Sequence, residues 1–170
     1  RSADITKDVC VLEIGPGIGT MTQYLCENAG KVIAVEIDKN LIPILTEDTL
    51  AAYDNVKVIN SDVLKLDLKK LAEEENGGRP IKVVANLPYY ITTPILMKFI
   101  EESDMVDSIT VTVQEEVADR LCAKPSSEEY GAITASIDAV GNAEKIMRID
   151  RKMFYPAPNV DSAVVKISMN

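Results

Sequence analysis

The sequence contains no histidine, and this absence excludes several kinds of catalytic chemistry. A Ser-His-Asp triad, a histidine general base and a histidine-ligated zinc ion are all impossible in this chain. Any reaction must instead use carboxylates, amides, lysines, tyrosines or a bound cofactor, and we expect no metal ion to take part.

Long apolar runs and abundant cysteine are also missing. No uninterrupted apolar run approaches the roughly 20 residues that a membrane-spanning helix needs, and no charged-then-apolar leader opens the chain. We therefore expect neither a membrane protein nor a secretory signal. The three cysteines, Cys10, Cys26 and Cys122, stand far apart in apolar surroundings. This pattern predicts reduced core thiols in a cytoplasmic protein.

Positive charge is scarce as well, since 18 lysines and arginines face 27 acidic residues and the formal net charge is -9. Such a balance argues against non-specific electrostatic binding of nucleic acid over a broad surface, because that affinity comes from basic side chains that displace counterions from phosphates. Basic residues do gather locally, and either scattered surface charge or contacts with a nucleic acid can explain them. They form two groups: Lys65, Lys69 and Lys70, and Lys145, Arg148, Arg151 and Lys152.

Short apolar segments rich in valine and isoleucine predict a seven-stranded sheet. The segments lie at 9–15, 31–38, 55–62, 81–86, 107–113, 143–149 and 160–169. Apolar residues at helical spacing predict helices at 19–29, 39–52, 64–75, 93–102, 115–121 and 131–140. This alternation predicts one α/β domain with a mostly parallel sheet and helices on both faces. The last two strands have no long helix between them, which predicts an antiparallel hairpin at one edge of the sheet.

A glycine-rich turn, "EIGPGIG" at 13–19, lies between the first predicted strand and the first predicted helix. Open α/β sheets bind nucleotides at this place, where glycines let a ligand approach the backbone closely. A dinucleotide motif needs a third glycine at position 20, but that residue is Thr20 and the third glycine is Gly19. The spacing therefore disfavours a nicotinamide cofactor, while a purely structural turn remains an alternative.

Two acids follow at the ends of the next strands. Glu36 ends the second predicted strand, about twenty residues past the turn, where a carboxylate can accept hydrogen bonds from both hydroxyls of a ribose. Asp62 ends the third predicted strand. Either acid alone can be a helix cap or a solvated side chain. Together with the glycine turn, they predict a nucleoside-binding cradle at one edge of the sheet.

The fourth predicted strand ends in "NLPYY" at 86–90. If the Asn86 side-chain oxygen and the Leu87 carbonyl each accept one hydrogen of an adenine amine, they can aim the nitrogen lone pair at an electrophile. Pro88 fixes one backbone angle, and Tyr89 can stack on the base for about 1–3 kcal/mol. The alternative is an ordinary Asn-Pro turn with packed tyrosines.

These motifs resemble those of the small-subunit ribosomal RNA adenine dimethyltransferases (KsgA type). The resemblance covers nearly the whole chain and is carried by "LEIGPGIGTMT", "VEID", "SDVL", "VVANLPYYITTPI", "VTVQEEVADRL", "YGAIT" and "FYPAPNVDSAVV". It implies a Rossmann-like class I methyltransferase that uses S-adenosylmethionine. It also implies that two methyl groups are placed on each of two adjacent adenines near the end of the small-subunit RNA.

The resemblance also assigns roles to individual residues. The turn of Gly15, Gly17 and Gly19 meets the methionine portion of S-adenosylmethionine, and Glu13 lies near its amino-acid group. Glu36 binds the ribose and Asp62 the adenine of the cofactor. The target adenine is held by Asn86, Leu87, Pro88 and Tyr89, with Asn86 also beside the cofactor and Phe154 on the other face of the base.

Two features of that family are not found in the sequence: an upstream Q-N-F-L segment and a small helical domain after the closing strands. We therefore expect residues 1–170 to be a single catalytic domain without them. Tyr90 stands where the family often has asparagine. The expected partner is small-subunit RNA in a partly assembled ribosomal subunit, bound by a monomer. Two alternatives remain: methylation of a large-subunit adenine, which Leu87 disfavours, and a non-catalytic role in ribosome assembly.

Overall fold

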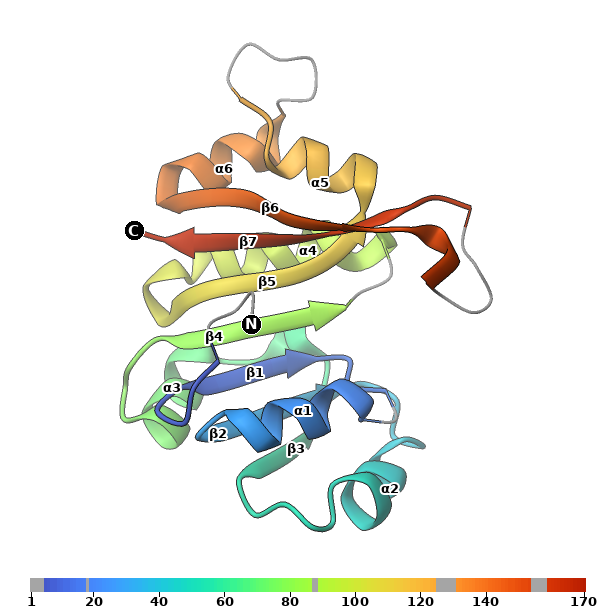
Figure 1. Ribbon diagram of the computed structural model, residues 1–170. Coiled ribbons are helices and arrows are strands. Elements are labelled where there is room, and N and C mark those ends of the chain that lie inside the picture. The colour runs from blue at the N-terminus through green and yellow to red at the C-terminus, as the bar shows by residue number, and fades with distance from the viewer. Residues whose placement is uncertain (1–4, 18, 87–88, 125–130, 154–158) are drawn as a thin grey trace.

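A single seven-stranded sheet organises the chain, in the order β3-β2-β1-β4-β5-β7-β6 (Figure 1). The structure is a computed structural model that describes residues 5–17, 19–86, 89–124, 131–153 and 159–170. The strands are β1 Cys10–Ile14, β2 Lys31–Glu36, β3 Val56–Asn60, β4 Ile81–Asn86, β5 Val106–Gln114, β6 Gly141–Ile149 and β7 Ser162–Met169.

The strand directions confirm the predicted topology. The pairs β2–β3, β1–β2, β1–β4 and β4–β5 are parallel. Strand β7 runs antiparallel to both β5 and β6, so β6 and β7 form an antiparallel pair at the edge. The insertion of β7 between β5 and β6 was not specified by the sequence pattern, because a hairpin can pair with the sheet through either of its strands.

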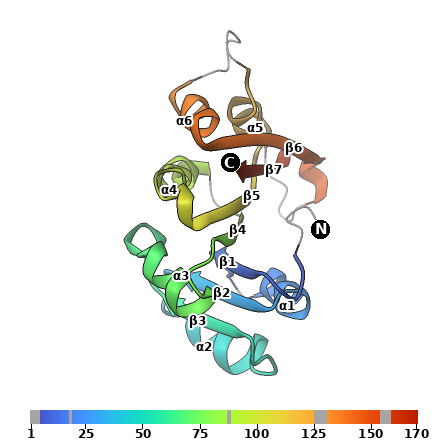
Figure 2. The ribbon, with the colours of Figure 1, turned by 90° about the vertical axis from the view of Figure 1, so that its left-hand side faces the viewer.

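Helices cover both faces of the sheet, as predicted. They are α1 Thr20–Asn28, α2 Ile42–Ile44, α3 Leu68–Asn76, α4 Tyr89–Glu101, α5 Glu115–Leu121 and α6 Ala132–Val140. Figure 2 shows α1 on the opposite side of the sheet from α3 and α4. Two buried clusters correspond to these layers, and β1 contributes Val11 to one cluster and Leu12 to the other. Strands buried on both faces explain why their sequences read as continuous apolar runs.

The prediction of a single α-helix at 39–52 was wrong. Only Ile42–Ile44 is α-helical, and a π-helical turn follows at Leu45–Thr49. The predicted helix at 64–75 is also divided, into a 3₁₀ turn at Val63–Lys65 and α3. Periodicity does not distinguish these helix types, because all of them place apolar residues three to five positions apart.

Candidate active site

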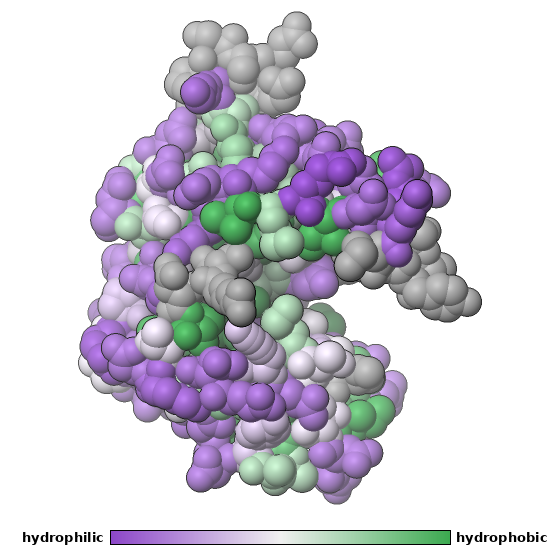
Figure 3. Space-filling view, in the orientation of Figure 1, coloured by the Kyte–Doolittle hydropathy of each residue, from purple (hydrophilic) through white to green (hydrophobic). Residues whose placement is uncertain are grey.

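The predicted site residues that the structure describes converge at the carboxyl ends of the parallel strands. The order β3-β2-β1-β4 places Glu36 and Asn86 on the two strands that flank β1, and the glycine turn follows β1 directly. Open α/β sheets bind ligands at this edge. The described surface is hollowed on the right-hand side of Figure 3, where the carboxyl ends of β1 and β4 lie.

The glycine turn adopts a backbone that favours glycine at three positions. Gly15, Gly17 and Gly19 have φ angles of 69°, 61° and 94°. A Cβ added at Gly15 or Gly17 would meet no atom within 4 Å, so the backbone there is open to a ligand. A Cβ at Gly19 would lie 2.7 Å from Cγ2 of Thr49. A side chain at position 19 would therefore clash with the π-helical turn. The ligand contact that the resemblance implied for Gly19 stays a prediction.

Glu36 holds the turn in place. Its side chain is buried, its Oε1 accepts a hydrogen bond from the Gly17 N–H at 3.1 Å, and its Oε2 accepts one from the Asp38 N–H at 3.0 Å. The Asn60 side-chain amide donates to the Glu36 carbonyl at 2.8 Å. Each carboxylate oxygen has a second lone pair, so Glu36 can also accept hydrogen bonds from a ligand.

Asp62 lies at the same edge but also caps a helix. Its Oδ1 accepts a hydrogen bond from the Leu64 N–H at 3.0 Å at the start of the 3₁₀ turn. The helix-capping role that the sequence offered as an alternative is therefore observed. Because only Oδ1 takes part in the cap, the lone pairs of Oδ2 can accept hydrogen bonds from a ligand.

Two apolar residues beside these acids were missed by the sequence analysis. The side chain of Ile37, directly after Glu36, is 69% exposed, and that of Leu64, two residues after Asp62, is 46% exposed. An apolar side chain that stands in water next to a polar binding edge suits the face of a flat base. No signal in the sequence set them apart, because Ile37 falls within the predicted strand at 31–38 and Leu64 begins the predicted helix at 64–75.

Glu13 is buried in β1, and it lines a cavity of about 390 Å³ between α1 and the sheet. Burial raises the pKa of the Glu13 carboxyl to about 7, while the hydroxyl of Thr22, which donates to Oε1, opposes the increase. Met21 and Tyr24 of α1 and Thr110 of β5 also line this cavity. A carboxyl group that is partly protonated at neutral pH ionises readily when a cation enters beside it.

Asn86 is exposed at the end of β4, pairs with Thr112 of β5 and lines the same cavity. Leu87, Pro88 and Phe154 lie outside the described residues. Tyr89 begins α4, four residues before the predicted start at 93, and its side chain is also outside the description. The structure therefore brings Asn86 to the cradle, and the remaining parts of the predicted adenine clamp stay predictions.

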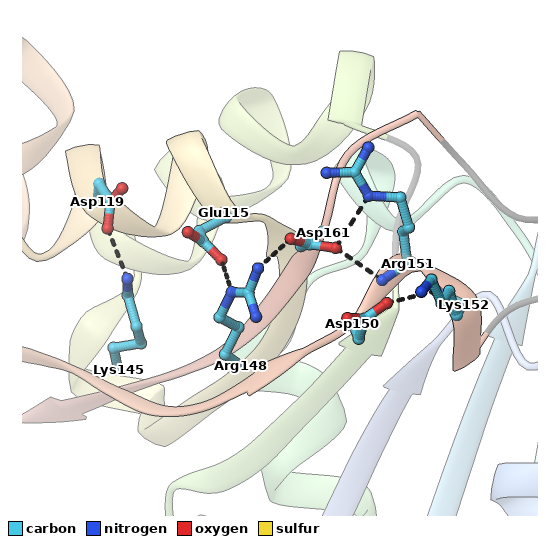
Figure 4. A network of polar contacts seen from close by, with 8 residues as sticks. All are labelled: Glu115, Asp119, Lys145, Arg148, Asp150, Arg151, Lys152 and Asp161. Atoms are coloured by element: carbon cyan, nitrogen blue, oxygen red, sulfur yellow. Dashed lines mark hydrogen bonds and ion pairs between the residues drawn. The ribbon is translucent and has the colours of Figure 1, made fainter.

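The basic group near the end of β6 is largely paired with acids (Figure 4). Lys145 contacts Asp119 at 2.6 Å, and Arg148 contacts Glu115 at 2.6 Å. Arg151 contacts Asp161 through Nε at 3.2 Å. Internal pairing favours the interpretation of this group as local surface charge. It does not provide a broad positive surface for a polyanion.

Among the described residues, no group of three or more His, Cys, Asp or Glu side chains can hold a metal ion. Within the same ranges, no helix is long and apolar enough to cross a membrane.

The architecture and the glycine turn define the fold as that of the class I S-adenosylmethionine-dependent methyltransferases. A dimethyladenosine transferase from Plasmodium falciparum superposes with a TM-score of 0.82 at 29% identity, over 99% of this chain and 58% of that one. The 23S rRNA methyltransferase ErmE superposes with a TM-score of 0.84 at 28% identity, over 99% of this chain and 64% of that one.

The chain belongs to the ribosomal RNA adenine dimethylase family, which it matches over residues 1–170. It is 58% identical over 170 residues to ribosomal RNA small subunit methyltransferase A from Lachnoclostridium phytofermentans. The match covers 100% of this chain and 59% of that relative, so the chain spans less than two thirds of its length. The family resemblance read from the motifs is confirmed.

Proposed function

We propose that the protein transfers methyl groups from S-adenosylmethionine to the exocyclic amines of two adjacent adenines in small-subunit ribosomal RNA. The observation that carries this proposal is the convergence of the glycine turn, Glu36 and Asn86 on three neighbouring strands. The name of the relative that is 58% identical supports the choice of RNA.

The residues of the cradle fit this cofactor. The backbone at Gly15 and Gly17 is open, and the cavity beside Glu13, of about 390 Å³, lies within the roughly 300–1,000 Å³ that is common for ligand sites. Glu13 would bind the ammonium group, Glu36 the ribose and Asp62 the adenine. Apolar contacts to the adenine ring would come from Ile37 and Leu64, which stand exposed beside the two acids.

The proposed chemistry suits a chain without histidine. S-adenosylmethionine, when bound, supplies an electrophilic methyl group. The protein orients the adenine amine. Asn86 and the Leu87 carbonyl accept hydrogen bonds from the two amine hydrogens, so that the nitrogen lone pair faces the methyl group. Tyr89 and Phe154 would hold the two faces of the base. Orientation takes the place of a strong base, and the proton leaves to water after transfer.

We further propose that the target is presented within a partly assembled small subunit in the cytoplasm, and that the protein acts as a monomer. The net charge of -9 supports a structured particle as the partner, because free RNA is held mainly by unpaired basic side chains. The pairing of Lys145, Arg148 and Arg151 with acids supports the same choice.

Methyl transfer to small subunits prepared without these methyl groups tests the proposal. The expected result is transfer that Asn86→Ala reduces by at least about 100-fold, since the amine loses an orienting acceptor. Asn142→Ala, which changes an exposed asparagine on the edge strand β6, is the matched control and should keep full activity. Absence of transfer by the unaltered protein, or full activity of Asn86→Ala, would refute the assignment.

Methylation of a large-subunit adenine is the second candidate, because ErmE superposes as well as the dimethyladenosine transferase does. The two substrates are compared in one assay, with unmethylated 23S RNA beside small subunits. Faster transfer to 23S RNA would identify large-subunit RNA, and not small-subunit RNA, as the substrate. Normal subunit maturation with inactive Asn86→Ala would instead favour a non-catalytic role in assembly.

A further inference from the structure

Asn60, the last residue of β3, joins the end of that strand to the end of β2. Its side-chain amide donates one hydrogen bond to the Glu36 carbonyl at 2.8 Å and another to the Ile37 carbonyl at 3.3 Å. The register of β2 with β3 ends at Glu36 and Asn60, so the Ile37 carbonyl lies beyond it. The Asn60 side chain therefore extends the attachment between the two segments by one residue past the end of β2.

The corner at residues 36–38 that Asn60 holds carries the contacts proposed for the nucleoside half of the cofactor. The Glu36 carboxylate accepts hydrogen bonds from the N–H groups of Gly17 and Asp38. A ribose hydroxyl can reach it only along the lone pairs that these two bonds leave, so the position of the corner decides whether the ribose is bound well. Asp62, proposed for the adenine, follows Asn60 by two residues. The Asn60 amide thus links the two acids of the cradle.

We propose that Asn60 is a positioning residue for the cofactor: its amide fixes the corner at residues 36–38 so that the Glu36 carboxylate can accept hydrogen bonds from the ribose hydroxyls. The proposal rests on the proposed function, which assigns the ribose to Glu36. A group that is held in its binding position before the ligand arrives binds more tightly, because less ordering is left to the binding step.

Asn55 makes the same kind of contact at the other end of the same strand and offers a matched control. It directly precedes Val56, the first residue of β3, and its amide donates to the Cys26 carbonyl at 2.8 Å and to the Ala29 carbonyl at 3.2 Å. Because β2 and β3 are parallel, Asn55 lies at the amino end of the strand and the cradle at the carboxyl end. Asn55→Ala and Asn60→Ala each remove two hydrogen bonds to backbone carbonyls, but only Asn60→Ala removes them at the cradle.

Titration calorimetry with S-adenosylmethionine tests the positioning role. Asn60 is exposed, so its hydrogen bonds compete with water, and we expect Asn60→Ala to weaken binding by about 3- to 10-fold, the range for hydrogen bonds of modest net strength. Asn55→Ala should weaken it by less than about twofold, because it lies far from the ligand. Urea denaturation should show a lower midpoint for both variants, so a loss of stability alone does not distinguish them.

A second ligand separates positioning of Glu36 from general loosening of the site. The 2′,3′-dideoxy analogue of S-adenosylmethionine lacks both hydroxyls that Glu36 is proposed to bind. We therefore expect Asn60→Ala to weaken the binding of this analogue by a smaller factor than that of S-adenosylmethionine. A merely structural role of Asn60 would weaken the binding of both ligands by the same factor.

Equal affinities of Asn60→Ala and Asn55→Ala for S-adenosylmethionine would overturn the proposal, and so would equal fold losses for the two ligands in Asn60→Ala. If binding follows the expected pattern but no methyl group reaches small-subunit RNA, the positioning role stands and the proposed reaction is refuted. Absence of S-adenosylmethionine binding by the unaltered protein would refute the proposed function, and the positioning role with it. If Asn60→Ala does not fold, Asn60→Asp and Asn55→Asp replace the pair with the same criteria, because aspartate keeps the size and has no side-chain N–H to donate.

Discussion

The buried carboxyl group of Glu13 leads to a quantitative prediction about stability and pH. Burial raises its pKa from an ordinary value of 4.5 to about 7 in the folded protein. At about 1.4 kcal/mol for each pH unit, this difference corresponds to about 3 kcal/mol. The folded state keeps its proton between these two pKa values, while the unfolded state loses it. The contribution of Glu13 to stability therefore falls as the pH rises from about 4.5 to about 7.

Glu13→Gln removes this titration and keeps an oxygen for the Thr22 hydroxyl. We expect the variant and the unaltered protein to differ little in unfolding free energy near pH 4.5. At pH 8 the variant should be the more stable by up to about 3 kcal/mol, because it no longer buries a charge. Urea denaturation followed by circular dichroism at both pH values measures the difference.

Glu73→Gln is the control, since Glu73 is an exposed acid on α3. Its effect on the unfolding free energy should be the same at both pH values. If the difference in unfolding free energy between Glu13→Gln and the unaltered protein also stays constant from pH 4.5 to pH 8, the raised pKa of Glu13 is refuted. Glu13→Gln should also bind S-adenosylmethionine more weakly, because Glu13 is the proposed partner of the cofactor's ammonium group and the variant lacks the negative charge.

Two further predictions concern packing and the thiols. Gly19→Ala should cost about 1–3 kcal/mol of unfolding free energy, since its Cβ would meet Thr49 at 2.7 Å. Gly77→Ala, at a φ of 62° and with no atom within 4 Å of the added Cβ, should cost less, and equal losses would refute the packing role. Cys10 and Cys26 should react slowly with a thiol reagent, because burial raises both pKa values to about 11. Fast labelling of the folded chain at pH 8, compared with the chain in urea, would contradict this.

Most of the fold could be predicted from short-range patterns. Runs such as Lys31–Glu36 are apolar because the strands are buried on both faces, and that pattern is visible without a partner. The π-helical turn at Leu45–Thr49 was not predicted, because apolar periodicity does not distinguish it from an α-helix. The start of α4 at Tyr89 was also missed, because residues 86–90 were interpreted as a turn after the fourth strand and the helix was predicted from 93 onward.

The sequence by itself determined the order of the elements, the glycine turn and the placement of Glu36, Asp62 and Asn86 at or just after the ends of strands. These features depend on residue types and on spacing along the chain. Only the tertiary structure decided that Gly19 serves packing, that Glu13 titrates near neutral pH and that Asp161 takes up the charge of the arginines near β6. Each of these depends on atoms from distant parts of the chain, because burial and ion pairing arise only when the elements come together.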